Sequence, residues 1–260
     1  MKTKPTRIRL DQALVERGQC ESREQAKRSI LAGQVRINDR VAAKPSELVN
    51  PADRIVTEAP PRYVSRGGFK LEHALREFKL DVHGQSAIDV GASTGGFTDC
   101  LLQAGATHVC SVDVGSGQLA WKLRRDKRVT VMEKKNARHL RPEHFPQPFK
   151  PFDLAVIDCS FISITKILLP VAELVRTGGR LVVLIKPQFE AGKAEADRGA
   201  GVITDPAIHE RVLQEIQDYV ASVSGLRWIA QTESPLLGPA GNKEFLLLLE
   251  RTRPPLDQVC

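Results

Sequence analysis

The alternation of short apolar runs with amphipathic segments, which begins near residue 86, constrains the fold of this chain more than any other sequence feature. Helix-like segments separate apolar runs at residues 86–90, 108–114, 129–133, 152–158 and 180–186. Such alternation predicts a parallel sheet with helices on both faces. Ligands of such sheets bind at the carboxyl ends of the strands, in the crevice where the strand order reverses.

A glycine-rich turn, DVGASTGGFT at residues 89–98, follows the first predicted strand. Its glycines permit a tight turn and a close backbone approach to a ligand. The spacing is not that of a dinucleotide fingerprint, because Ser93 stands where that motif has its second glycine. Asp113, at the end of the second strand, can accept hydrogen bonds from both ribose hydroxyls or can cap the next helix. Together the turn and Asp113 favour an adenosine ligand.

The last segment, residues 225–250, suggests two strands joined by a loop rich in proline and glycine. A terminal strand pair after a fifth strand and its helix resembles the class I S-adenosylmethionine-dependent methyltransferase fold. The resemblance implies a Rossmann-like α/β domain with a seven-stranded, mostly parallel sheet. Because one fold hosts many activities, the function has to be argued from the site.

Four charged residues fall where this sheet would bring them to one edge. They are Lys70, before the first strand, Asp158 and Lys186, at the ends of two strands, and Glu244, at the start of the last strand. Each alone has an ordinary explanation, such as a helix cap or a lysine leading the chain back to solvent. Their joint placement at one rim predicts an active site.

The first 60 residues have the pattern of a small basic module. Two short helices are predicted, one ending at Gly18 and one capped by Ser22 and Gln25 and ending at Gly33. Strand signals at 34–38 and 53–56 follow. This stretch holds 12 Lys and Arg against 8 Asp and Glu, so a net +4 of the formal +7 lies in under a quarter of the chain.

Most of residues 8–56 resembles the S-four-type RNA-binding module, on the string RLDQALVERGQCESREQAKRSILAGQVRINDRVAAKPSELVNPADRI. The resemblance implies contacts to the phosphates of a folded RNA that is recognised by its shape. The implied RNA-binding residues are Arg23, Lys27, Arg28 and Arg36. A solvated helix face is the alternative interpretation of the same charges.

Two prolines, Pro60 and Pro61, stiffen a short connection before a new periodic pattern begins. We therefore expect an RNA-binding domain at 1–59, a linker at 60–65, a methyltransferase domain at 66–250 and an unstructured tail at 251–260.

A more specific resemblance rests on six strings, VSRGGFKL, DVGASTGGFT, DVGSGQLAWKLR, AVIDCSFIS, IKPQFEAGK and GPAGNKEFLLLL. In this order, after an S-four-type module, they resemble the TlyA family of rRNA 2′-O-methyltransferases, once catalogued as haemolysins. The catalytic half is also similar to the FtsJ-like enzymes with a Lys-Asp-Lys-Glu tetrad. The resemblance implies S-adenosylmethionine as cofactor and rRNA in ribosomal subunits as partner, with a cytidine as target. Tyr63 departs from it, since some members carry a tryptophan there, which leaves any linker role in sensing RNA or cofactor in doubt.

Site residues are carried over from this resemblance position by position. The tetrad falls on Lys70, Asp158, Lys186 and Glu244. Cofactor contacts fall on Asp89, Gly91, Ser93, Gly95, Asp113 and Asn136, and Arg66 joins the RNA-binding set.

Methyl transfer to a ribose 2′-hydroxyl requires alignment of the reacting atoms and loss of the hydroxyl proton. A lysine accepts a proton only as the uncharged amine, which is rare at neutral pH because the ordinary pKa is about 10.4. We expect Lys186 to be the base and Lys70 a second cation, with Asp158 and Glu244 orienting the two amines. Lys186 could instead position the 2′-oxygen, and the sequence does not separate these roles.

Composition narrows the class of protein further. The longest apolar runs are far shorter than the roughly 18 residues of a membrane helix, and the basic start leads into no apolar signal core. The five cysteines are scattered without a zinc-like pair. We expect a cytoplasmic protein with no membrane partner and no metal, and the formal charge of +7 favours a polyanionic partner.

Two alternative functions remain at this level. An RNA base methyltransferase is the nearer one, although DCSF lacks the prolines typical of amino-group enzymes and Cys159 lacks the preceding proline of a cytosine C5 nucleophile. A non-enzymatic rRNA-binding or membrane-active protein would leave the glycine turn and Asp113 unexplained. The target nucleotide, the ribosomal subunit and the oligomeric state stay open.

Overall fold

The computed structural model describes residues 7–58, 61–192, 195 and 199–252. The chain divides into two compact units, Met1–Arg62 and Tyr63–Cys260, and the division falls inside the stretch expected to be a linker. Strand β12 extends to Arg251, and residues 253–260 of the expected tail lie outside the described residues.

The N-terminal unit contains the two predicted helices, α1 (Leu10–Glu16) and α2 (Arg23–Leu31). Ser22 caps α2 by accepting a hydrogen bond from the Gln25 backbone N–H at 3.2 Å. Gly33, just past the end of α2, has a positive φ of 72°, as expected of a glycine that ends a helix. The helix starts and stops predicted from the sequence are therefore confirmed.

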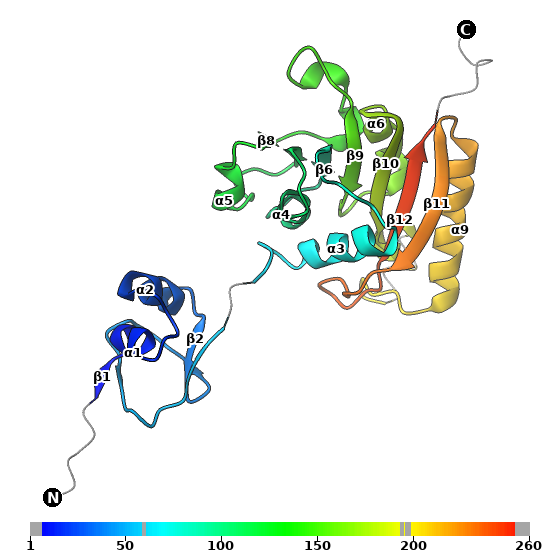
Figure 1. Cartoon of the computed structure of the whole chain (residues 1–260). Helices are drawn as coiled ribbons and strands as arrows, with labels where there is room; N and C mark the ends of the chain where they lie inside the picture. Colours follow the sequence, from blue (N-terminus) through cyan, green and yellow to red (C-terminus); the bar gives the residue numbers. More distant parts are fainter. Residues whose placement is uncertain (1–6, 59–60, 193–194, 196–198, 253–260) are drawn as a thin grey trace, which may run out of the picture. The chain divides into compact units, whose positions relative to one another are not determined.

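Two small antiparallel sheets complete this unit (Figure 1). One pairs β1 (Ile8–Arg9) with β4 (Leu48–Val49), and the other has the order β3 (Arg40–Val41), β2 (Val35–Ile37), β5 (Ile55–Thr57). Leu10, Leu14, Ile30, Val35 and Val49 are buried in one core between helices and strands. The unit thus has its own hydrophobic core.

The second unit contains a seven-stranded sheet in the order β11-β12-β10-β9-β6-β7-β8. The strands are β6 (Ser86–Val90), β7 (His108–Val112), β8 (Val129–Met132), β9 (Phe152–Ile157), β10 (Val175–Ile185), β11 (Leu226–Glu233) and β12 (Phe245–Arg251). Within this sheet of the described residues, β12 runs opposite to the other six strands, so it is antiparallel to both β10 and β11. The predicted mostly parallel, seven-stranded α/β sheet is confirmed.

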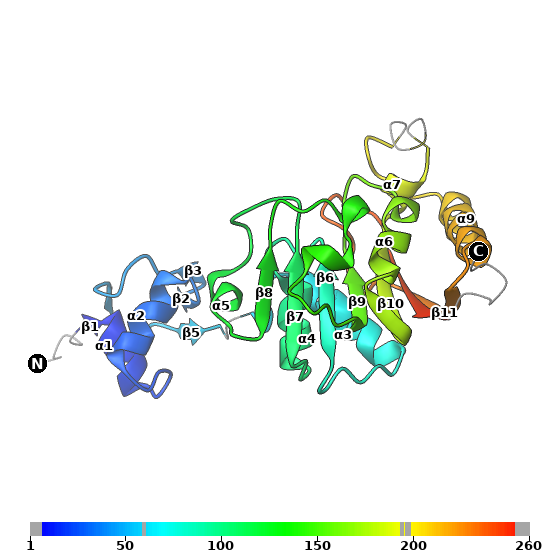
Figure 2. The same cartoon turned by 90° about the horizontal axis from the view of Figure 1, so that it is seen from above.

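Helices cover both faces of this sheet (Figures 1 and 2). On one face, α3 (Gly67–Glu77), α4 (Gly96–Gln103) and α5 (Trp121–Arg124) pack against the sheet. On the other face, α6 (Leu168–Ala172) and α9 (Pro206–Ser222) pack against it. Short helical turns η1 (Ala137–His139), η2 (Pro142–His144), η3 (Ile164–Lys166) and α7 (Pro187–Glu190) lie in the connections. Among the described residues, no helix combines the length and apolar character needed to cross a membrane.

Strand order reverses between β6 and β9. The chain leaves β6 for α4, which covers one face of the sheet, and leaves β9 for α6, which covers the other face. A parallel sheet forms its ligand crevice at such a reversal, outside the carboxyl ends of the strands. The start of β12 lies at the same edge, since β12 is antiparallel to β10 and Phe245 pairs with Ile185. The fold therefore brings the ends of β6, β9 and β10 and the start of β12 together.

Tyr63, the residue that departs from the family pattern, belongs to the core of the second unit. Its side chain is buried and meets Phe69 edge to face, with ring centroids 5.1 Å apart. A Cβ on Gly68 would overlap the Tyr63 ring, so the glycine on α3 makes room for it. Tyr63 thereby packs against the first turn of α3, the turn that carries Lys70.

We predict that Gly91→Ala destabilises the second unit by more than about 2 kcal/mol. Gly91 has a φ of 85°, and a Cβ there would overlap the carbonyl oxygen of Asp158 and lie 2.9 Å from its carbon. The matched control is Gly84→Ala, at φ 75° with open space around it, which should cost only the roughly 1–2 kcal/mol of a left-handed alanine. Urea unfolding of both variants measures the difference, and equal losses would contradict the close backbone contact.

Candidate active site

Two adjoining cavities, of about 430 and 570 Å³, lie at the carboxyl edge of the sheet. The first is lined from α3, from the turn after β6, and from the residues that follow β9 and β10. The second is lined from the turns after β6, β7 and β8 and from the loop after β9. Both are bounded by Gly91, Ser93, Asp158 and Ser160. The cavities therefore form two parts of one groove.

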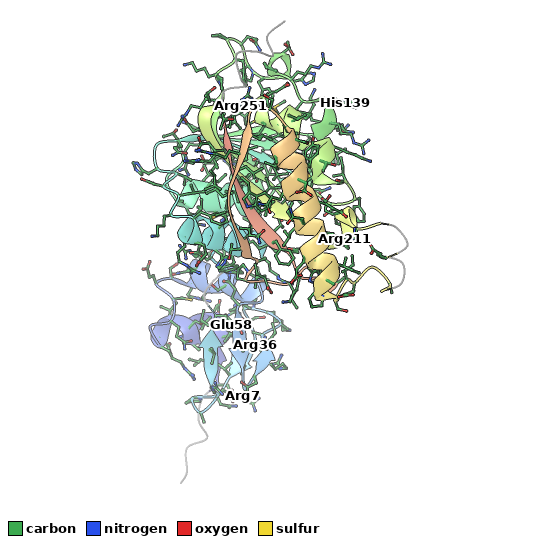
Figure 3. All side chains as sticks on the ribbon, turned by 90° about the vertical axis from the view of Figure 1, so that its right-hand side faces the viewer. Arg7, Arg36, Glu58, His139, Arg211 and Arg251 are labelled. Carbon is green, nitrogen blue, oxygen red and sulfur yellow. The ribbon has the colours of Figure 1, made fainter. Side chains whose placement is uncertain are left out.

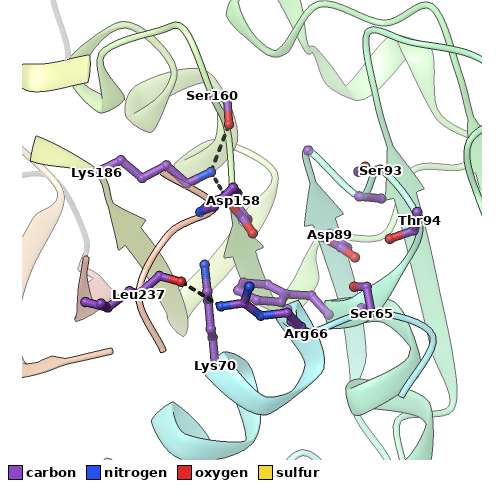
Figure 4. A pocket seen from close by; sticks show the side chains of 16 residues that line it. Ser65, Arg66, Lys70, Asp89, Ser93, Thr94, Asp158, Ser160, Lys186 and Leu237 are labelled. Carbon is purple, nitrogen blue, oxygen red and sulfur yellow. Dashed lines mark hydrogen bonds and ion pairs between the residues drawn. The ribbon is translucent and has the colours of Figure 1, made fainter. Parts of the chain in front are cut away.

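Lys186 and Asp158 form an ion pair in the first cavity, with Nζ 2.5 Å from Oδ1 (Figure 4). Lys186 Nζ also donates a hydrogen bond to Ser160 Oγ at 2.9 Å. Asp158 and Lys186 directly follow the neighbouring strands β9 and β10, and the side chain of Lys186 is only 11% exposed. The adjacent strand ends thus hold this amine in a defined direction.

Lys70 approaches the same space from α3 and points toward Asp158 and Lys186 (Figure 4). It forms an ion pair with Glu244, and the two side chains are 8% and 1% exposed. Glu244 does not line the cavity and lies behind Lys70. The structure therefore brings three of the four tetrad residues to the cavity wall, while the fourth holds Lys70.

Glycines of the turn after β6 are required mainly by packing. Gly91 lies against the backbone of Asp158, and a Cβ on Gly95 would overlap Leu123 and lie 2.7 Å from Leu119 Cδ1. Gly95, expected to contact the cofactor, lines neither cavity. Gly91 and Ser93 line both cavities, so they stay candidates for ligand contact.

Asp89, on β6, is completely buried and lines the first cavity. One oxygen, Oδ2, accepts hydrogen bonds from the Thr98 backbone N–H at 2.9 Å and from Thr98 Oγ1 at 2.6 Å. The other oxygen, Oδ1, has no hydrogen-bond partner among the residues that the structure describes. Burial raises the pKa of Asp89 to about 7, with a smaller contribution from the negative charge of Asp158. A donor or cation in the cavity would satisfy this oxygen.

Asp113 and Asn136 line the second cavity. The oxygens of Asp113 each accept one backbone N–H, Oδ2 from Ser93 at 2.8 Å and Oδ1 from Gly115 at 2.7 Å. The alternative role as a cap of the next helix is wrong, because α5 begins at Trp121 with Ala120 as its N-cap residue. Each carboxylate oxygen has a further lone pair for a hydroxyl. Val114 and Ile162 add apolar walls. A polar end and apolar walls suit a nucleoside.

Most RNA-binding candidates of the N-terminal unit are paired with carboxylates. Arg23 contacts Asp11 at 2.9 Å, and Lys27 contacts Glu24 at 2.6 Å. Arg36 contacts Glu58 at 2.6 Å, and these two residues are labelled in Figure 3. These cations keep 54%, 40% and 42% of their side chains exposed, so they remain accessible to phosphates. Arg66, in the other unit, lines the first cavity and donates to the Leu237 carbonyl at 2.9 Å.

Sequence reasoning missed Ser160 and Glu190. Ser160 lies within a motif string but contacts Lys186, which is 26 residues away in the sequence. Glu190 accepts hydrogen bonds from Ser163 and Ile164 across a similar separation. Both contacts depend on the adjacency of β9 and β10, and a serine or glutamate after a strand carries no signal of its own.

Cys159 has the environment of a packed thiol. Burial raises its pKa to about 12, and its sulfur lies 3.6 Å from the Val90 carbonyl oxygen. A thiol with that pKa is protonated at neutral pH and is a poor nucleophile. Within the described part of the chain, no cluster of three or more His, Cys, Asp or Glu side chains could hold a metal ion.

The strand order, the single antiparallel strand and the groove at the reversal define a class I methyltransferase fold. Residues 63–251 match the FtsJ-like methyltransferase family, and residues 8–55 match the S4 domain. The chain belongs to the FtsJ-like methyltransferase family and carries an N-terminal S4 domain. Its resemblance to TlyA proteins is also confirmed by the relatives that follow.

Two curated relatives cover nearly all of the chain. The 16S/23S rRNA (cytidine-2′-O)-methyltransferase TlyA of Mycobacterium tuberculosis is 43% identical over 245 residues, which is 94% of this chain and 90% of the relative. Hemolysin A of Brachyspira hyodysenteriae is 39% identical over 239 residues, which is 92% of this chain and 98% of the relative. The relatives of this chain thus include one named as an rRNA methyltransferase and one named as a haemolysin.

Solved structures agree with the fold. A candidate hemolysin from Streptococcus thermophilus has a TM-score of 0.70 and 42% identity, covering 99% of this chain and 92% of its own. The O-methyltransferase TomG from Streptomyces achromogenes, solved with S-adenosylmethionine, has a TM-score of 0.50 and 18% identity, covering 74% and 83%. The second likeness concerns the fold alone.

We predict that Asp89→Asn stabilises the protein more at pH 8 than at pH 5. Because the folded-state pKa of Asp89 is raised to about 7, its contribution to stability is greatest below pH 4 and is lost as the pH rises through 7. Between pH 5 and 8 the loss should be about 2–3 kcal/mol in the native protein and absent in the variant.

Thermal unfolding at both pH values measures this effect. The control is Asp126→Asn, because Arg128 lowers the pKa of Asp126 and that group is ionised throughout the range. If Asp89→Asn and the native protein differ in Tm by the same amount at pH 5 and at pH 8, burial does not raise the pKa of Asp89.

Proposed function

We propose that this protein is an S-adenosylmethionine-dependent ribose 2′-O-methyltransferase that acts on rRNA. The observation that carries the proposal is the pair of lysine–carboxylate contacts, the partly buried Lys186 with Asp158 and the buried Lys70 with Glu244, beside a cavity suited to a nucleoside. A set of amines held at the mouth of such a cavity suits a reaction in which a hydroxyl must be oriented and deprotonated.

The residues of the groove fit S-adenosylmethionine. Asp89 presents a buried, unpartnered oxygen, which suits the ammonium group of the cofactor. Asp113 has lone pairs for the ribose hydroxyls, and Asn136, Val114 and Ile162 line the remaining wall of that cavity. When bound, this cofactor supplies an electrophilic methyl group. Gly91 and Ser93 lie between the two cavities and would border both halves of the cofactor.

Lys186 is the residue that we propose to contact the 2′-oxygen. Asp158 and Ser160 fix its amine on two sides, so the remaining N–H direction or the lone pair of the neutral amine is available to the substrate. Asp158 pairs with the Lys186 amine, and Lys70 supplies a second amine on the same cavity wall.

Lys70 would act beside Lys186, with its direction set by Glu244. Because Glu244 is almost fully buried, loss of either partner would leave an uncompensated charge, which typically costs about 3–5 kcal/mol. A pair that is so well shielded keeps the Lys70 amine in one place. We propose that Lys70 stabilises negative charge on the 2′-oxygen.

The RNA class follows from the N-terminal domain and from the relatives. An S4 domain with exposed cations suits a folded RNA recognised by shape, and the Mycobacterium tuberculosis relative is named for cytidines of 16S and 23S rRNA. We extend to this chain a cytidine of small- or large-subunit rRNA, within ribosomal subunits. Arg23, Lys27, Arg28, Arg36 and Arg66 are the cations that we propose to contact RNA.

We predict that Lys186→Gln and Lys186→Arg each lower kcat by about 10²-fold or more, with the Kd for rRNA unchanged. Glutamine removes the amine, and arginine keeps the charge but does not release a proton at neutral pH. Single-turnover methylation measures kcat, and an RNA-binding assay measures the Kd for rRNA. The control is Lys243→Gln, because Lys243 is an exposed lysine paired with Glu233. Near-normal turnover of Lys186→Arg would show that Lys186 positions the 2′-oxygen and does not accept its proton.

The reaction itself is tested with labelled S-adenosylmethionine and separated ribosomal subunits that lack the modification. After alkaline digestion we expect label in an alkali-resistant dinucleotide, because a 2′-O-methyl group blocks cleavage at that position. The labelled subunit identifies the substrate. Label in mononucleotides alone would indicate a base methyltransferase, and absence of label in both subunits would favour a non-enzymatic RNA-binding protein.

A further inference from the structure

The segment that follows β10 holds the loop after β9 at two separate points. Lys186 contacts the beginning of that loop, at Asp158 and Ser160. Glu190, four residues later at the end of α7, contacts its far end. There Glu190 Oε2 accepts a hydrogen bond from Ser163 Oγ at 2.7 Å, and Oε1 accepts one from the Ile164 backbone N–H at 2.9 Å.

Glu190 is partly buried, and burial raises its pKa. In the part of the chain that the structure describes, its carboxylate makes no ion pair, so two neutral donors are its main stabilisation. Removing a carboxylate from water costs free energy that two such hydrogen bonds only partly offset. A residue in that position contributes little to overall stability, which points to a local role.

The loop between the two points, residues 158–163, is also held at its start, where the Asp158 N–H donates to the Val90 carbonyl at 3.0 Å, and by the packing of Ile162 on the core. Phe161 has a positive φ of 63° and is 90% exposed, and its ring meets Phe189 of α7 with centroids 4.9 Å apart. A non-glycine residue in the left-handed region is strained, so the surrounding contacts must hold it there. Both cavities are lined by this loop, through Asp158 and Ser160.

We infer that Glu190 is a positioning residue for the methyltransferase site. By fastening Ser163 and Ile164 to α7, it keeps Asp158 and Ser160 at the distances that aim the Lys186 amine into the cavity. Glu190 itself touches neither cavity. The inference rests on the proposed function, but the clamp can also be tested without any measurement of activity.

The test compares Glu190→Ala with Glu190→Gln in the full-length protein. Glutamine keeps an acceptor for the Ile164 N–H and offers an N–H to Ser163 Oγ, so it should restore most of the function. Alanine should lower kcat about 10-fold or more, because misplacing reactive groups by about 1 Å can cost 10²-fold, while KM for the ribosomal subunit changes little. Glu215→Ala, an exposed glutamate of α9 paired with Arg211, is the matched control.

A second measurement reports on the loop directly. Cys159 lies on it and is partly buried, and N-ethylmaleimide labelling followed by peptide mass spectrometry gives its reactivity. Glu190→Ala should speed labelling of Cys159 several-fold, and Glu190→Gln should not. Cys100 and Cys110, buried beneath the two faces of the same sheet, are internal controls.

Each result decides the question. A kcat of Glu190→Ala within twofold of the native value would overturn the inference. Equal acceleration at Cys100, Cys110 and Cys159, with a lowered Tm, would also overturn it, because Glu190 would then support the whole unit. If the native protein methylates neither subunit, the proposed function fails, while selective labelling of Cys159 would still establish the clamp.

Discussion

The active edge of this protein depends on one backbone contact, in which Gly91 lies against the carbonyl group of Asp158. β6 and β9 are neighbours, yet the chain leaves β6 for α4 on one face and leaves β9 toward α6 on the other. A Cβ on Gly91 would overlap the Asp158 carbonyl oxygen, so the approach of the two chains at this point requires a glycine. The contact joins the glycine turn to Asp158, so the groove continues from the second cavity to the two lysines.

The ion pairs at this edge of the sheet contribute more to the orientation of the two amines than to the stability of the fold. Lys186 with Asp158 and Lys70 with Glu244 form two neutral pairs with little exposure to solvent. Buried ion pairs are weak sources of stability, because desolvation of both charges offsets their attraction. What such pairs provide is a fixed direction for each amine. Asp89 differs from both carboxylates, since its second oxygen has no partner and its pKa is raised to about 7.

The cations of the N-terminal domain combine structural and surface roles. Arg9 and Arg23 both contact Asp11, whose side chain is fully buried, and the hydrogen bond from Arg9 lowers the pKa of Asp11 to about 2. Arg23 nevertheless keeps half of its surface exposed. Substituting such an arginine would therefore disturb the fold as well as a contact to RNA, whereas Arg28 has no ion pair among the described residues.

The sequence by itself determined the seven strands of the large sheet, the starts and stops of the two N-terminal helices, and the edge at which Lys70, Asp158, Lys186 and Glu244 gather, because periodicity and strand ends are local properties. Tertiary structure decided which amine pairs with which carboxylate, as it did the contacts of Ser160 and Glu190. It also assigned Gly95 to packing against Leu119 and Leu123 rather than to the cavity wall. The contacts of the two lysines and of Glu190 join residues from 26 to 174 positions apart, so they exist only once β9, β10 and β12 lie side by side.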